Sequence, residues 1–162
     1  MSANTGVGST DQAEGGGIFG RFFLNYVDEF YLLFRLIFAF LAALHGAQKA
    51  FGLWGFPVPA PMPIVNVAGW VEFISALLIG FGVLTRLGAG ALVVTMVIAY
   101  FMMHAPNGIW PHLFPMPGEG QSPFTASGGE VTILWFACAG IIGILGSRRW
   151  GIERLMFKKE LL

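Results

Sequence analysis

Charged residues are scarce in this sequence of 162 residues. Charged side chains make up 11% of it, nine Lys and Arg balance nine Asp and Glu, and hydrophobic residues account for 56%. A chain this apolar is unlike an ordinary soluble domain, and its zero net charge provides no basic field that could hold nucleic acid. The sequence therefore predicts an integral protein of a lipid bilayer, without a nucleic-acid partner.

Cysteine is almost absent, since Cys138 is the single one in the chain. One cysteine excludes an internal disulfide, a Cys-x-x-Cys redox pair and a thiolate metal cage. The spacing of the histidines and carboxylates indicates no metal site and no covalently bound cofactor. Any redox role must therefore rest on a cofactor, a quinone or a partner subunit.

Proline is absent from four long apolar segments, although the chain contains nine prolines. Each segment approaches the roughly 20 residues that a helix needs to cross a hydrocarbon core, and a proline inside would break its hydrogen bonds. Small residues four positions apart, such as Ala42 with Gly46, would let the helices pack closely. We expect an all-α, polytopic membrane protein, with a four-helix bundle in residues 31–146. The segments are residues 31–50, 65–84, 87–103 and 128–145.

The regions that flank the expected bundle differ in composition. Residues 1–17 end in a glycine run and predict a flexible tail. Residues 18–30 carry aromatic residues at helical spacing with charges on the opposite side, which favours an amphipathic helix at the membrane interface. A docking helix for a partner subunit is the alternative. Residues 147–162 are rich in Arg and Lys and predict a basic cytoplasmic tail.

The basic residues are distributed unequally between the two sides of the expected bundle. With the N-terminus inside, eight of them lie at or near the inner side and Lys49 alone lies outside. By the positive-inside rule, both termini of this multi-pass membrane protein are predicted to be cytoplasmic. The eight are Arg21, Arg35, Arg86, Arg148, Arg149, Arg154, Lys158 and Lys159.

Polar side chains at membrane depth form the candidate site. A rise of about 1.5 Å per residue puts Glu72 level with His45, and His45 and Lys49 share one helix face. A carboxylate inside a membrane is costly unless it is paired or neutral, so we expect Glu72 to turn inward toward His45 or Lys49. His104 and Glu130 are expected at the same outer end.

This candidate polar pocket has more than one interpretation. It could be a structural ion pair that fixes the helix register, or an outward-facing pocket in which His45 or Glu72 exchanges a proton with a quinone headgroup. A haem between His45 and His104 is disfavoured because their depths differ. Glu130 also fits a capping box with Ser127, and Arg35 is expected to reach the inner headgroups or to pair with Glu29.

The long loop between the third and fourth segments is a candidate lid. Residues 105–126 hold five prolines together with Trp110, Phe114 and Phe124. Proline lowers the entropy lost on ordering, and aromatic rings offer large apolar faces. The loop is therefore expected to cover the outer mouth of the bundle or to dock a partner. An irregular connector is the alternative.

Three motifs resemble a known family. They are HGAQKAFG at residues 45–52, VEFISALLIGFGVLTRLGAGAL at residues 71–92 and GSRRWGIE at residues 146–153. Their order and spacing are similar to those of the DoxX family of small bacterial inner-membrane proteins. The resemblance implies a four-helix membrane bundle. It also implies a distant similarity to DoxD, the membrane subunit of archaeal thiosulfate:quinone oxidoreductase.

The resemblance and the polar cluster together suggest an accessory or quinone-interacting subunit of a membrane redox system. The alternative is a purely structural subunit that packs against a larger energy-converting complex. Both hypotheses imply other membrane subunits as partners. The sequence neither predicts nor excludes catalytic activity of the chain itself.

Overall fold

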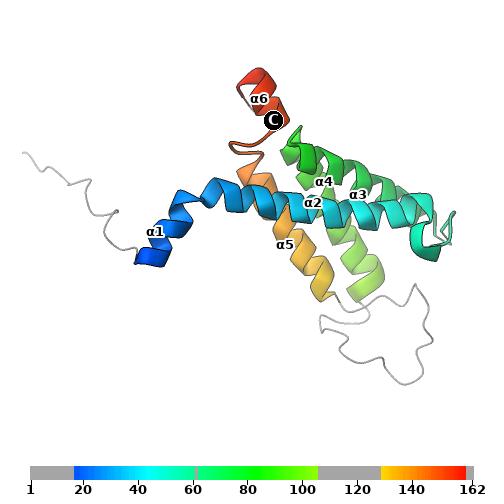
Figure 1. The fold of residues 1–162 in the computed structure, drawn as a ribbon. Coiled ribbons are helices and arrows are strands. Elements are labelled where there is room, and N and C mark those ends of the chain that lie inside the picture. Colours follow the sequence, from blue (N-terminus) through cyan, green and yellow to red (C-terminus); the bar gives the residue numbers. More distant parts are fainter. Residues whose placement is uncertain (1–16, 61, 106–128, 160–162) are drawn as a thin grey trace, which may run out of the picture.

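The computed structural model describes residues 17–60, 62–105 and 129–159, and within these ranges every regular element is helical (Figure 1). A short helix α1 precedes four longer apolar helices, and a last short helix α6 follows them. The bounds are α1 (Ile18–Asn25), α2 (Val27–Phe51), α3 (Pro63–Phe81), α4 (Thr85–Ala99), α5 (Glu130–Leu145) and α6 (Ile152–Phe157). A 3-10 turn, η1 (Leu53–Gly55), follows α2, and a π turn, η2 (Tyr100–His104), continues α4.

Three of the described helices are long and apolar enough to cross a membrane: α2, α3 and α4 with its π turn. Helix α5 is a shorter apolar helix of 16 residues. Large hydrophobic side chains stay exposed along these helices, as on Phe40, Ile74 and Ile144. Lipid tails are the environment in which such a surface is stable, so the chain is a multi-pass membrane protein.

Glycine and proline set the ends of the long helices. Gly52 ends α2 and Gly82 ends α3, both with a positive φ (70° and 68°) that glycine adopts without strain. Pro63 is the first residue of α3, where its missing N–H removes no helix hydrogen bond. No described helix therefore has a proline in its interior. This is the pattern from which the apolar segments were predicted.

The long helices form two antiparallel pairs, α2 with α3 and α4 with α5, joined by the α3–α4 hairpin (Figure 1). The two pairs move apart with distance from this hairpin. The buried core lies where the pairs are close together. It consists largely of small residues, which allow the close helix packing that the sequence spacing predicted. The core residues are Phe38, Ala39, Ala42, Ala76, Ile79, Ala89, Leu92, Ala139 and Ile142.

One predicted boundary is wrong by several residues. Residues 18–30 were expected to form a single interfacial helix, but α1 ends at Asn25 and α2 already begins at Val27. Tyr26 interrupts the helix with φ −114° and ψ 20°. Residues 27–30 therefore form the first turn of α2. The apolar spacing continues across this break, so periodicity alone does not locate it.

Candidate functional site

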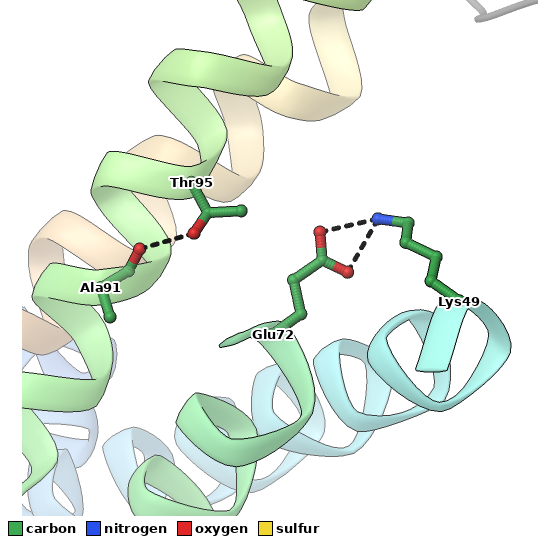
Figure 2. Close-up of polar contacts among 4 residues, drawn as sticks. All are labelled: Lys49, Glu72, Ala91 and Thr95. Carbon is green, nitrogen blue, oxygen red and sulfur yellow. Dashed lines mark hydrogen bonds and ion pairs between the residues drawn. The ribbon is translucent and has the colours of Figure 1, made fainter. Parts of the chain in front are cut away.

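The centre of the candidate site is an ion pair between α2 and α3. Lys49 Nζ lies 2.7 Å and 2.8 Å from the two carboxylate oxygens of Glu72 and donates a hydrogen bond to each (Figure 2). The Glu72 side chain is only 2% exposed, whereas that of Lys49 is 24% exposed. Of the two partners predicted for Glu72, the structure therefore selects Lys49.

Two glycines allow this pair to form. A Cβ on Gly46 would lie 2.4 Å from the backbone nitrogen of Phe73, and a Cβ on Gly69 would lie 2.6 Å from Cβ of Lys49. No side chain fits at either position, so α2 and α3 are in direct backbone contact. Lys49 follows Gly46 by three residues, and Glu72 follows Gly69 by three. The same spacing thus places one charge beside the contact on each helix.

The ion pair lies in the wall of a groove between α3 and α4. The groove has a volume of about 760 Å³, and both Lys49 and Glu72 line it. Most of its other lining is aliphatic, including Val67 and Val71 on α3 and Val94 and Ile98 on α4. Thr95 also lines the groove, but its hydroxyl donates to the carbonyl oxygen of Ala91, 2.8 Å away (Figure 2). Arg86 lines the groove as well. The site therefore combines a long, mostly apolar groove with the Lys49–Glu72 ion pair.

The predicted polar pocket is only partly assembled. His104, on the π turn after α4, lines the same groove as Lys49 and Glu72. His45 does not line it, because its ring packs edge-on against Trp135 of α5, with centroids 4.8 Å apart. His45 and Lys49 therefore contact different neighbours, although both lie on α2.

Glu130 is the first residue of α5 and does not line the groove. Gly129 is the N-cap, and as a glycine it has no side chain that could cap the helix. Within the described part of the chain, one carboxylate oxygen of Glu130 is buried without a hydrogen-bond partner. Ser127, its predicted capping partner, lies outside the described residues. The lid candidates Trp110, Phe114 and Phe124 also lie outside them.

Arg35 corrects a second expectation. It was predicted to reach the headgroups or to pair with Glu29, but it is 1% exposed. Its guanidinium donates to the carbonyl oxygens of Ser147, at 2.7 Å, and of Trp150. Tyr31, one turn earlier, donates its hydroxyl to the carbonyl oxygen of Gly146 at 2.7 Å. The segment after α5 is thus held by the first half of α2.

Glu153 attaches the same segment to the α3–α4 hairpin. Its carboxylate accepts a hydrogen bond from the backbone N–H of Leu84 at 3.1 Å, and its own N–H donates to the carbonyl oxygen of Gly82. Leu84 has a positive φ of 48°, which this contact helps to maintain. We call these contacts, with those of Tyr31 and Arg35, the C-terminal latch. Residues 147–157, predicted as part of a tail, are thus an ordered component of the fold.

Sequence reasoning missed the latch, although the GSRRWGIE motif contains most of it. Gly151 packs so closely that a Cβ there would lie 2.4 Å from Ser147 Oγ and 2.9 Å from the Gly82 carbonyl oxygen. The repeated glycines in this motif and in the hairpin were the available signal. Elsewhere in the described residues, no group of three or more His, Cys, Asp or Glu side chains is placed to hold a metal ion.

The fold and the site define a small multi-pass membrane protein whose helices carry a buried ion pair beside an apolar groove. Residues 30–105, which contain this pair and both groove walls, match the DoxX family. The match confirms the resemblance to the DoxX family for this part of the chain. It leaves out α5 and α6, and with them the GSRRWGIE motif.

The chain is also similar to a protein of Haemophilus influenzae. It is an uncharacterised protein that is 27% identical over 140 residues, and the alignment covers 83% of this chain and 96% of that protein. The similarity thus extends over nearly all of the relative. No solved structure matches the chain significantly.

Proposed function

We propose that the chain is an accessory, quinone-interacting subunit of a membrane redox system, and that the α3–α4 groove is its quinone site. The observation that carries this proposal is the Lys49–Glu72 pair in the wall of a mostly apolar groove. Sites for lipophilic ligands are mostly apolar and carry a few polar groups that orient the ligand. A quinone has matching parts, namely an apolar isoprenoid tail and a ring with two carbonyl oxygens.

The side chains of the pair suit both redox forms of such a ring. An ammonium group has three N–H donors, and two of those on Lys49 are used by Glu72, which leaves one for a quinone carbonyl oxygen. The Glu72 carboxylate oxygens can accept a hydrogen bond from a quinol hydroxyl. Val94 and Ile98 would contact the tail. The chain would supply the binding site, and a redox centre in a partner subunit would supply or remove the electrons.

The same groove provides a role for His104 from the predicted pocket. It lies at the end of α4, where the π turn places it in the groove lining. Histidine can carry protons near neutral pH, so His104 is a candidate to exchange a proton with a bound quinol. His45 has no such role here because it lies against Trp135 instead.

A second candidate function rests on the surface at the start of the chain. Phe22, Phe23 and Tyr26 are each about half exposed, and their rings contact one another. An aromatic surface of this kind could pack against a larger energy-converting complex, in which case the chain would be a structural subunit. It could equally lie at the membrane interface, as the sequence predicted.

We also propose that the membrane is the bacterial inner membrane and that both termini are cytoplasmic. The similarity to the DoxX family and to a bacterial relative supports the choice of membrane. The excess of basic residues on one side, eight against one, supports the orientation of the termini. In this orientation the latch lies on the cytoplasmic side. The Lys49–Glu72 pair lies toward the outer side.

Quinone retention tests the proposed site. Gly90 lines the groove and a Cβ there would meet no atom within 4 Å, so Gly90→Phe can fill the groove without a backbone clash. Gly140→Phe is the matched control, because Gly140 on α5 is equally open and lies outside the groove. Each full-length protein would be purified in mild detergent, and its extractable quinone measured per mole of protein.

We expect the wild type and Gly140→Phe to retain quinone and Gly90→Phe to lose it. Equal retention in all three proteins would overturn the site. A quinone-free wild type that co-purifies with stoichiometric larger subunits would favour the structural role instead.

A further inference from the structure

The C-terminal segment, residues 146–159, exposes positive charges but buries its own carboxylate. Glu153 is its one acidic residue, and this side chain is 2% exposed because it faces the α3–α4 hairpin. Arg148 is also engaged, with its guanidinium 2.8 Å from an Asp28 carboxylate oxygen. The latch thus removes the negative charge of the segment from its outer surface.

Cations remain on that outer surface. Arg149, Lys158 and Lys159 are all exposed. The Arg149 guanidinium lies over the ring of Trp150, 5.3 Å from its centroid, which holds this cation beside an aromatic side chain. No described carboxylate of residues 146–159 is exposed to offset these three charges.

An exposed apolar face accompanies the cations. Ile152, Leu155 and Met156 lie three and four positions apart, so they share one face of α6. Leu155 is 71% exposed and Met156 is 69% exposed. Lys158 falls on a different side of the helix from these residues. Within the described chain, nothing packs over this apolar face.

The latch fixes where this surface lies. Arg35 and Glu153 hold the segment against α2 and against the turn between α3 and α4, so α6 stands where membrane helices end (Figure 1). Apolar side chains next to cations, at the end of membrane helices, match a surface that dips into the headgroup layer of a bilayer.

We propose that residues 149–159 form a binding surface for anionic phospholipid headgroups. Arg149, Lys158 and Lys159 contact the phosphates, while Leu155 and Met156 enter the acyl boundary. The surface is distinct from the α3–α4 groove, and it does not depend on the quinone proposal. It also does not depend on which side of the membrane is cytoplasmic.

Native mass spectrometry of the full-length protein tests this surface. The protein would be released from micelles that contain equal amounts of phosphatidylglycerol and phosphatidylcholine, and the ratio of the two bound lipids would be measured. We compare the wild type with the triple variant R149Q/K158Q/K159Q. The matched control is R149K/K158R/K159R, which keeps every charge.

We expect the wild type and the control to prefer phosphatidylglycerol, and the glutamine variant to lose at least about fivefold of that preference, the effect of a single basic residue near an anionic surface. The three side chains are exposed, so unchanged circular dichroism should confirm intact folding. If the wild type binds phosphatidylglycerol and phosphatidylcholine equally, the proposal is overturned, and the α6 face would instead be a candidate surface for a protein partner. A preference that survives in the glutamine variant would also overturn it, because the anionic lipid would then bind elsewhere.

Discussion

Gly46 of α2 lies directly against Gly69 of α3, since a Cβ on Gly46 would stand 2.8 Å from the carbonyl oxygen of Gly69. The backbones of the two helices are in direct contact here, because neither glycine leaves room for a side chain. This contact also sets the rotation of each helix about its axis, and so directs Lys49 and Glu72 toward each other. The ion pair is therefore a consequence of glycine placement as much as of charge.

Gly46→Ala should separate α2 from α3. The added methyl group meets backbone atoms, which cannot move aside as a flexible side chain can, so we expect a loss of about 1–3 kcal/mol in the free energy of unfolding. Gly90→Ala is the control, because its Cβ meets nothing within 4 Å and alanine favours the helix. Unfolding in detergent, followed by circular dichroism, measures both. Equal stability of the two variants would contradict the direct backbone contact.

Lys49→Met should be more damaging than Glu72→Gln. The first change leaves a buried carboxylate without its cation and should cost about 3 kcal/mol. The second keeps the shape and a hydrogen-bond acceptor, and Lys49 is exposed enough to reach water, so its cost should stay near 1 kcal/mol. The double variant K49M/E72L should recover much of the loss. In a double-mutant cycle of K49M, E72L and K49M/E72L, a coupling energy near zero would show that the pair contributes nothing to stability.

The sequence predicted the membrane depth of this pair, but it did not predict which residue of α2 Glu72 would contact. Helical rise put Glu72 level with His45 and one turn from Lys49, and it left both as partners. The choice depends on how α2 is rotated, and that rotation follows from the backbone contact at Gly46 and Gly69. In the observed rotation, the His45 ring lies against Trp135 of α5. The four apolar segments, by contrast, could be located from proline and hydropathy alone.

Gly151→Ala should open the C-terminal latch without unfolding the long helices. Its Cβ would collide with Ser147 and with the Gly82 carbonyl oxygen. Hydrogen exchange should become faster in residues 82–86 and 146–157 and stay unchanged in α2 and α3. Leu155→Ala, at a position 71% exposed on α6, is the control and should leave exchange unaltered. Identical exchange in the two variants would show that the latch does not hold the segment.

The glycines indicated close packing, but the individual contacts of the latch could not be predicted, because they join residues that are distant in the sequence. Arg35 lies 112 residues from Ser147, and no local period connects them. An arginine one turn inside a membrane helix is ordinarily expected to extend toward the headgroups. Here two backbone carbonyls accept its hydrogen bonds instead, and the planar guanidinium suits both at once.

Membrane topology can be tested by labelling single cysteines in a Cys138→Ser background. We expect probes at Ser2 and Leu162 to react only from the cytoplasmic side, and a probe at Gln121 to react from outside, because basic residues are retained on the inner side. Labelling of position 2 or 162 from outside would reverse the proposed orientation. It would leave the proposed lipid-binding surface of residues 149–159 intact.

Photoaffinity labelling is the most direct test of the quinone site. Full-length protein in liposomes would be irradiated with a photoreactive quinone, and the labelled peptides mapped by mass spectrometry. We expect labelling of residues that line the α3–α4 groove, such as Val71, Val94 and Ile98, competed by excess unmodified quinone and abolished in Gly90→Phe but not in Gly140→Phe. Labelling that is spread over the exposed side of α5, or that excess quinone does not reduce, would contradict a quinone site in this groove.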